Sequence, residues 1–375
     1  MEGNHTIVGK GTNGCNLEKN RIIYLDIART FAIIFVVLCH SVELIYKMNL
    51  QGWISISLNA RIFKTIVFTL GRIGVPLFLF LTGYLLLNRK YDNDADIKKF
   101  YKKNLLPLIV TTEVWILIYN IFLSLYNNKP FDTYSLIKEM LFLQKVPLMN
   151  MWYMPMIIGL YIGIPLLAKI VKSFSFKVIC PIMLAIFIFE YIEPMLNVFV
   201  RIFNFKETFY SDMNIPYMGA AYGLYLLIGY YIYNNKLRIK KELLIFLFLA
   251  NYIIILCIQL YSLSSESHYA YKVWYDSPFL LICTACLFTL FTRIDDNVIN
   301  ERISNIFTYI SRISMGIYFV HIIIITTSIK YIKNINGSLS LYTILLMIAA
   351  TALSIVIVWI FSRNKRVAKK LFLIK

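Results

Sequence analysis

The sequence predicts an all-α fold, a polytopic integral membrane protein with about ten transmembrane helices around a polar cavity. Hydrophobic residues make up 59% of the 375 positions and charged residues only 15%, whereas about a quarter of the residues in a soluble protein are charged. The mean hydropathy of +0.67 agrees with this composition. Apolar blocks recur along the whole chain. We therefore expect one membrane domain, although the length would suffice for two soluble domains.

Ten apolar blocks are long enough, or nearly so, to cross a hydrocarbon core of about 30 Å. They cover residues 22–45, 66–87, 105–126, 152–171, 177–193, 216–233, 242–262, 275–292, 306–329 and 340–362. The blocks at 177–193 and 216–233 are short, as is typical of tilted or partly re-entrant segments.

Two tails and several loops lie outside these blocks. Residues 1–20 are polar, and we expect them to be disordered. They do not resemble a cleavable signal sequence, because the apolar run that follows is too long. Residues 21–362 are predicted to form the membrane domain and residues 363–375 a short basic tail. The longest predicted external loops, which could shape a site that faces outward, are 46–65, 127–151 and 194–215.

The Lys and Arg residues between the blocks predict the orientation. With the N-terminus inside, 24 of them fall in cytoplasmic segments and 11 in external segments. Because cytoplasmic loops carry the excess of positive charge, both termini are predicted to be cytoplasmic. The strongest cytoplasmic marker is a lysine cluster that is typical of an interfacial helix leading into the third span. It consists of Lys98, Lys99, Lys102 and Lys103.

The composition argues against several classes of function. The net charge of +18 is spread between the apolar blocks and forms no basic domain, so no nucleic-acid partner is expected. The six cysteines form no disulfide framework. Cys283 and Cys286 have CxxC spacing, but one apolar helix supplies no second ligand pair. Helix packing is therefore expected there, and no metal site.

A polar stripe inside the first block is the strongest indication of chemistry. At 100° per residue, Asp26, Arg29, His40 and Glu43 fall within an arc of about 100°. An Arg or Asp at the centre of a bilayer costs roughly 2.5–3.5 kcal/mol on insertion scales. Four ionisable side chains on one face therefore predict a cavity lined by protein, not by lipid.

The two halves of this stripe suggest different roles. Arg29 and His40 are eleven residues apart, a rise of about 16 Å. Arg29, in the inner half, could hold a phosphate-bearing ligand, unless Asp26 simply neutralises it. His40, in the outer half, could act as a general base on a hydroxyl, or it could be a structural hydrogen-bonding residue. Glu43 could be a second base or a partner of His40.

The second block contains Gly71-Arg72-Ile-Gly74-Val-Pro-Leu-Phe and ends in Thr82-Gly-Tyr. Arg72 begins this block near the level of His40, and the glycines on either side of it permit a close backbone approach. Arg72 could stabilise an oxyanion or orient an acyl donor. The alternative is an interfacial arginine whose side chain extends to the headgroups.

These residues resemble the acyltransferase-3 family of membrane acyltransferases. The first-helix pattern is Leu-Asp, an Arg three residues later and a His eleven residues after that. The second-helix pattern is the run around Arg72. Four matching elements follow one another in this chain: Leu25-Asp26 with Arg29 and His40, Arg72 to Tyr84, Met151-Trp-Tyr-Met-Pro155, and Ser314-Met-Gly-Ile-Tyr318-Phe-Val-His321. The resemblance spans residues 21–362. Thr82 replaces a frequent serine, and Thr30 interrupts the usual apolar run.

The resemblance implies transfer of an acyl group, commonly acetyl from acetyl-CoA, to a hydroxyl of a cell-envelope glycan, a lipid-linked sugar or a small molecule. Its first-helix histidine and arginine correspond to His40 and Arg29, and its second-helix arginine corresponds to Arg72. We expect His40 and Arg72 to be catalytic, and we add Glu43 as a third candidate. We expect Arg29 and neighbouring basic residues to bind the acyl-CoA phosphates. Asp26 and Arg21 are further candidates for the acyl-CoA site. No metal is implied. The Lys- and Ile-rich composition is typical of AT-rich bacterial genomes, so we expect a bacterial plasma membrane.

The two later elements supply the candidate substrate-binding residues. Trp152 and Tyr153 could stack on a sugar, or they could belong to the aromatic belt at the membrane interface. Ser314, Tyr318 and His321 lie on one helix and could line the cavity that His40 faces. His321 could instead be a helix-packing residue.

Two other functions stay open at this point. A transporter of an envelope glycan or its precursor would also have ten spans and a polar cavity. The sequence has no pair of corresponding Gly/Pro-broken helices, which argues against this class. A membrane scaffold or sensor would tolerate alanine at Arg29, His40 and Arg72. The sequence predicts no particular oligomeric state.

Overall fold

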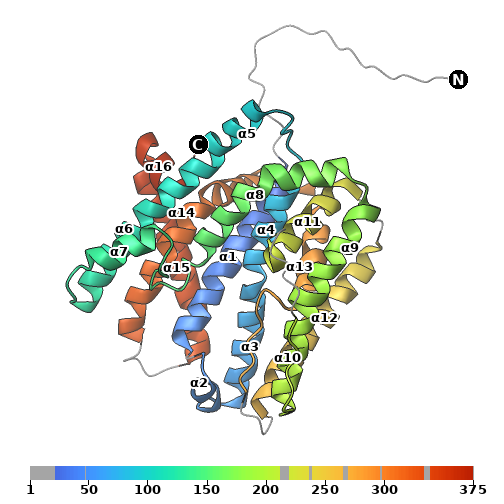
Figure 1. Ribbon diagram of the computed structural model, residues 1–375. Coiled ribbons are helices and arrows are strands. Elements are labelled where there is room, and N and C mark those ends of the chain that lie inside the picture. Colours follow the sequence, from blue (N-terminus) through green and yellow to red (C-terminus); the bar gives the residue numbers. More distant parts are fainter. Residues whose placement is uncertain are drawn as a thin grey trace, which may run out of the picture.

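The computed structural model confirms the all-α fold (Figure 1). It describes residues 22–46, 48–211, 219–235, 239–264, 269–295, 298–332 and 338–374. No β-strand occurs in these segments. The tail at residues 1–20 lies outside the described residues, and so does Arg21.

The chain folds into long helices joined by short ones. The long helices are α1 (Ile23–Ile45), α3 (Leu58–Arg72), α4 (Gly74–Leu86), α6 (Leu106–Asn127), α8 (Tyr153–Ser173), α9 (Phe176–Phe187), α11 (Ala220–Asn235), α12 (Lys241–Ser264), α13 (Pro278–Phe291), α14 (Glu301–Ile332) and α15 (Leu339–Ser362). The short helices are α2 (Leu50–Ile54), α5 (Asp94–Phe100), α7 (Thr133–Met140), α10 (Glu193–Ile202) and α16 (Lys365–Phe372).

All ten predicted apolar blocks are largely helical in the structure. Eight helical segments of the described chain are long and apolar enough to cross a membrane. The two remaining blocks correspond to α11 with 16 residues and α13 with 14 residues, which are shorter than a full span. The prediction of a multi-pass helical protein is therefore confirmed. Ten crossings and cytoplasmic termini stay predictions.

Two predicted boundaries were wrong. The second span begins at Leu58 and not at residue 66, and α2 occupies part of the loop expected before it. The fifth block is not short, because α9, a π-helical segment and α10 form one continuous helix to Ile202. Polar residues such as Asn59 and Arg201 lie in these extensions. Backbone hydrogen bonds form at polar positions as well as at apolar ones, so a helix can be longer than the apolar block that predicts it.

The lysine cluster lies where a helix was expected. The short helix α5 and the π-helical segment Tyr101–Leu105 continue directly into α6, so that Asp94–Asn127 is one helical segment. A helix that leads into the third span is therefore confirmed. Its position along the membrane interface stays a prediction.

The first helix lies at the centre of the molecule (Figure 1). In its most apolar stretch 83% of the residues are buried, compared with 22% in α15, and it packs against α3, α4, α14 and α15. Its polar stripe therefore faces other helices and not lipid. This arrangement is what allows charged side chains to persist inside an apolar span.

Glycines bring the second span against this central helix. A Cβ atom added at Gly71 would lie 2.7 Å from Cys39 Cα, and one at Gly74 would lie 2.6 Å from the Ala32 carbonyl oxygen. Only glycine fits at such distances, so the close approach predicted around Arg72 is confirmed. The guanidinium group consequently reaches the half of α1 that carries His40 and Glu43.

Candidate active site

The polar side chains of α1 form two groups, one near each end of the helix. The first group joins α1 to α14. Ser311 Oγ donates a hydrogen bond of 2.6 Å to Asp26 Oδ1, and Thr308 Oγ1 donates one of 3.2 Å to Asp26 Oδ2. Arg29 Nη1 donates to Ser311 Oγ at 3.4 Å. Asp26 is thus bound by hydroxyl groups of α14, and Arg29 lies beside it with its side chain only partly buried.

The second group is a chain of three charged or titratable residues from two helices. His40 Nδ1 lies 2.8 Å from Glu43 Oε2, and Arg72 Nη2 donates a hydrogen bond of 2.8 Å to Glu43 Oε1. His40 is 7% exposed and Arg72 only 4%. Because a carboxylate accepts hydrogen bonds, Nδ1 carries the proton of a neutral His40. The other ring nitrogen, Nε2, then has the free lone pair that a base needs.

Arg72 is enclosed by aromatic rings as well as by Glu43. Its Nη1 donates to the Tyr275 hydroxyl at 3.1 Å. The guanidinium carbon lies 4.3 Å from the centre of the Trp274 ring and 4.6 Å from that of Phe68. A buried, doubly bound guanidinium differs from an interfacial arginine that extends into the headgroups. Arg72 is therefore part of the core of this site.

Sequence analysis did not identify Trp274 and Tyr275 as site residues. They lie just before α13, at the boundary between a loop and an apolar block. The available signal was an aromatic pair followed by Asp276 at the predicted outer end of a span. It could not indicate Arg72 as the partner, because 203 positions separate Arg72 from Tyr275.

Trp152 extends this aromatic cluster towards the loops. Its ring stacks on Tyr275 with the centroids 5.2 Å apart, and it lies 5.6 Å from Trp274 and 5.9 Å from Tyr222. The neighbouring Tyr153 lies 5.7 Å from Tyr318 on α14. Both predicted aromatic residues therefore adjoin the group around His40.

The element that contains Ser314, Tyr318 and His321 lies on α14 and contacts His40. The rings of His40 and His321 are 5.4 Å apart. His321 Nδ1 hydrogen-bonds the Ile317 carbonyl at 2.9 Å, whereas its buried Nε2 has no hydrogen-bond partner in the described part of the chain. The Tyr318 hydroxyl donates to the Asn150 carbonyl at 2.6 Å. Ser314 is buried on the same helix, in the stretch between Ser311 and Tyr318.

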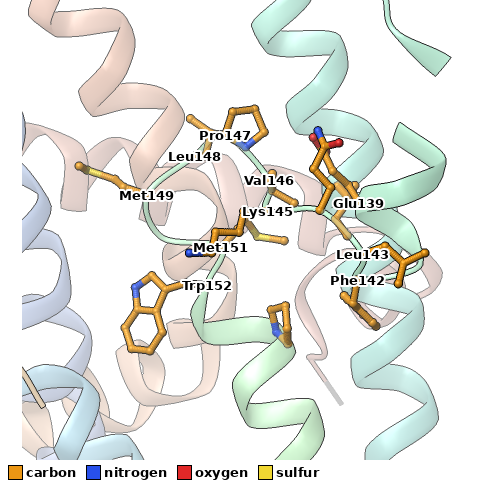
Figure 2. A pocket seen from close by; sticks show the side chains of 13 residues that line it. Glu139, Phe142, Leu143, Lys145, Val146, Pro147, Leu148, Met149, Met151 and Trp152 are labelled. Atoms are coloured by element: carbon orange, nitrogen blue, oxygen red, sulfur yellow. The ribbon is translucent and has the colours of Figure 1, made fainter. Parts of the chain in front are cut away.

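A cavity of about 580 Å³ opens beside Trp152 (Figure 2). Its wall is the segment between α7 and α8 together with side chains of α6 and α7. It is lined by Ile116, Glu139, Phe142, Leu143, Gln144, Lys145, Val146, Pro147, Leu148, Met149, Met151, Trp152 and Pro155. Asn120 Nδ2 donates to Glu139 Oε2 at 2.6 Å. Burial raises the pKa of the Glu139 carboxyl above its ordinary value.

A second, more polar cavity of about 360 Å³ lies beside Trp274. Polar side chains from α10 and from the segment before α13 line it, together with aromatic rings. They include Glu193, Asn197, Arg201, Tyr269, Lys272, Trp274 and Asp276. The two cavities thus adjoin two rings of the cluster that surrounds Arg72.

A metal centre would need several ligands close together. Within the described segments, no three His, Cys, Asp or Glu side chains are grouped so that they could hold a metal ion. The carboxylate of Glu43 instead interacts with an imidazole and a guanidinium group.

Similarity to known proteins points to acyl transfer. The model of the acyltransferase-3 family, described as an acyltransferase domain, matches residues 22–363. A protein of Acidianus two-tailed virus, named "Putative acetyltransferase ORF330", is 26% identical over 217 residues, which are 54% of this chain and 62% of the viral protein. The matched part thus spans less than two thirds of that relative. No solved structure matches the chain.

Proposed function

The chain belongs to the acyltransferase-3 family, and from this premise we propose that it moves an acyl group from cytosolic acyl-CoA to a hydroxyl of a cell-envelope glycan or a related acceptor. Acetyl is the acyl group that the family uses most often. The observation that carries this proposal is the largely buried His40–Glu43–Arg72 chain, in which the carboxylate holds one nitrogen of the imidazole.

His40 is the general base of the proposed reaction. Its Nε2 takes the proton of the acceptor hydroxyl as the oxygen attacks the thioester carbonyl. The tetrahedral intermediate then collapses and expels the CoA sulfur, which takes the proton back from the imidazolium. The products are the acyl ester and CoA with a free thiol, so His40 returns to its starting state.

Glu43 and Arg72 prepare His40 for this role. Glu43 holds the imidazole in the tautomer that leaves Nε2 free, and its negative charge stabilises the imidazolium that forms during transfer. Arg72 holds the carboxylate in place through Nη2. The role of Arg72 as an oxyanion donor stays a prediction, since both of its Nη atoms already bind Glu43 and Tyr275. Its buried Nε, which has no hydrogen-bond partner among the described residues, is the donor that this role would use.

Arg29 is the proposed contact for the donor phosphates. The rise of about 16 Å along α1 between Arg29 and His40 suits an elongated donor whose phosphates and thioester lie far apart. Acyl-CoA, with its pantetheine arm, has this shape. Asp26, bound by Ser311 and Thr308, keeps this part of α1 against α14. Arg21 remains a proposed donor contact outside the described residues.

The acceptor is proposed to approach from the side of Trp152. Aromatic rings can stack on sugars, and both cavities beside the cluster offer polar groups for hydroxyl recognition. Tyr153, Ser314, Tyr318 and His321 are proposed to line the path between this entrance and His40. A bacterial plasma membrane remains the proposed location.

Donor turnover by the purified protein tests this function. We would follow CoA release from acetyl-CoA in nanodiscs, with His40→Ala as the test variant and Ser41→Ala as its matched control on the same helix. Ser41 Oγ donates to the Val37 carbonyl and lies outside the charged chain. We expect loss of His40 to slow transfer about 100- to 10,000-fold, the usual contribution of general base catalysis. The control should retain activity.

Three other outcomes would contradict the proposal or replace part of it. Full transfer by a folded His40→Ala protein would exclude the role of this residue. An acetyl group trapped on His40 would indicate a covalent carrier instead of a base. Glycan flux across proteoliposomes without acyl-CoA would favour the transporter function.

A further inference from the structure

A third cavity, of about 630 Å³, lies at the C-terminal end of the chain and is built by α14, α15 and α16. We call it the tail pocket. It is lined by Tyr309, Arg312, Ile313, Trp359, Ser362, Lys365, Ala368, Lys369 and Ile374. Three of these residues are basic and none is acidic. The tail pocket therefore combines positive charge with aromatic and aliphatic side chains.

The last helix is fixed firmly enough to form a wall of this pocket. Thr111 Oγ1 donates to the Lys370 carbonyl at 2.8 Å, and Trp115 Nε1 donates to the Leu371 carbonyl at 2.7 Å. Phe372 is buried. In Figure 1, α16 lies beside α6 and α14. Helix α16 is thus anchored to α6 by hydrogen bonds and packing, and to α14 and α15 by packing.

Lys365 and Lys369 are four residues apart on α16 and so lie on one face of the helix. Both line the tail pocket, and both are exposed. Two ammonium groups of the same sign, presented side by side, repel each other unless an anion lies between them. The arrangement is therefore suited to an anionic ligand.

The tail pocket is separate from the proposed donor path. On α14, Thr308 and Ser311 face Asp26 on α1, whereas Arg312 and Ile313 line the tail pocket. Farther along the same helix, α14 packs closely on α15. A Cβ atom added at Gly316 would lie 2.6 Å from a methyl group of Val358. The tail pocket and the group around Asp26 are thus lined by different residues of α14.

The apolar part of the lining indicates what kind of anion binds. Trp359 is 49% exposed, on a helix whose most apolar stretch is only 22% buried inside the molecule. The Arg363 guanidinium lies 4.3 Å from the centre of its ring. Tryptophan and arginine gather at the boundary between hydrocarbon and headgroups. A soluble phosphate would gain nothing from this surface, whereas a phospholipid would place its acyl chains along it.

From this combination we propose that the tail pocket binds an anionic membrane phospholipid. The phosphodiester accepts hydrogen bonds from Lys365 and Lys369 beside the positive charge of Arg312, and the acyl chains lie against Trp359 and Ile313. Basic pockets between membrane helices bind anionic headgroups in this way. The lipid would hold α16 on the bundle, at a distance from the reacting groups.

Lipid binding to the full-length protein tests the proposal. We would titrate phosphatidylglycerol into the detergent-purified protein and measure the apparent Kd by native mass spectrometry, with phosphatidylcholine as the neutral lipid. The test variant is Lys365→Gln with Lys369→Gln. Lys98→Gln with Lys99→Gln is the control, because these lysines are exposed on α5 and do not line the tail pocket.

We expect the tail variant to bind phosphatidylglycerol about 30-fold more weakly, since each basic residue near an anionic lipid contributes roughly fivefold in affinity. The control variant should bind like the wild type, and phosphatidylcholine should bind equally weakly to all three. An unchanged Kd in the tail variant would overturn the proposal. So would displacement of the lipid by millimolar CoA, because the pocket would then hold a donor phosphate.

A photoreactive lipid provides a second test on the unmodified protein. Phosphatidylglycerol with a diazirine in its acyl chain should label α15 and α16 near Trp359 when the membranes are irradiated. Labelling confined to other helices would contradict the proposal, even if the lysine variant failed to fold.

Discussion

At the scale of single residues, Glu43 is the group on which the candidate site depends. It is a largely buried carboxylate whose two oxygens bind two different partners, His40 Nδ1 and Arg72 Nη2. Removing one partner of such a buried pair costs about 3–5 kcal/mol, because the other charge is left uncompensated. Loss of the Arg72 guanidinium is therefore expected to destabilise the folded protein and to release Glu43, which holds the proposed base.

Glu43→Gln tests this positioning. The amide keeps the size of the side chain, but it lacks the charge that stabilises an imidazolium and that pairs with Arg72. We expect kcat for acyl transfer to fall about 100-fold, within the range of general base catalysis, with little change in KM for acyl-CoA. Steady-state kinetics in nanodiscs would measure both constants.

Glu113→Gln is the matched control, since Glu113 lies on α6, outside the charged chain of His40, Glu43 and Arg72. A folded Glu43→Gln protein with the kcat of the wild type would show that the carboxylate does not act on His40. An increase in KM alone would instead assign Glu43 to substrate binding.

At the scale of elements, close contact between helices positions the site. Helices α4 and α11 approach through a reciprocal pair of glycines: a Cβ atom at Gly83 would collide with the Leu226 backbone, and one at Gly229 would collide with the Phe80 backbone. Small residues at such crossings let membrane helices pack by van der Waals contact, which is the main attraction available inside a lipid environment.

Gly83→Ala is expected to destabilise the bundle by about 1–3 kcal/mol, because the neighbouring atoms are backbone atoms that cannot rotate away. The measurement is the apparent melting temperature in detergent. Gly159→Ala on α8 serves as the control, since a Cβ atom there would meet nothing within 4 Å. Equal melting temperatures for the two variants would contradict the importance of the α4–α11 contact.

At the scale of the whole molecule, the helices divide into an enclosed centre and an outer layer. Most of α1 is buried, whereas α12 and α15 leave most of their apolar side chains at least partly exposed. Such exposure would be unfavourable in water, and it is expected where lipid covers the surface. The beginning of α1 and helix α16 lie at the same end of the bundle in Figure 1, and the excess of Lys and Arg predicts that this end is cytoplasmic.

Cysteine labelling tests this orientation. In a cysteine-free background, Lys98→Cys and Lys129→Cys place single thiols at exposed positions near the start of the helical segment Asp94–Asn127 and just after its end. A membrane-impermeant maleimide added to intact cells should label position 129 and leave position 98 unlabelled until the membrane is opened. The reverse pattern would invert the topology and would place Arg29 on the outside.

Part of the candidate site follows from local sequence. The order Asp26, Arg29, His40 and Glu43 along one helical face depends only on the 3.6-residue period, and the hydrogen bond from His40 to Glu43 connects residues three apart on that face. Burial of Arg72 by Tyr275 and Trp274 could not be predicted in this way, because it depends on how α3 packs against the distant segment before α13.

The sequence by itself determined that this is a multi-pass helical membrane protein and which family it resembles, because apolar run length, helical period and motif spacing are local properties. Only the tertiary structure decided that Glu43 joins His40 to Arg72, that α14 hydroxyls bind Asp26, and that α16 closes a basic pocket. These contacts follow from which helices pack together and at what rotation, and that is set by the complementary shapes of side chains far apart in the chain.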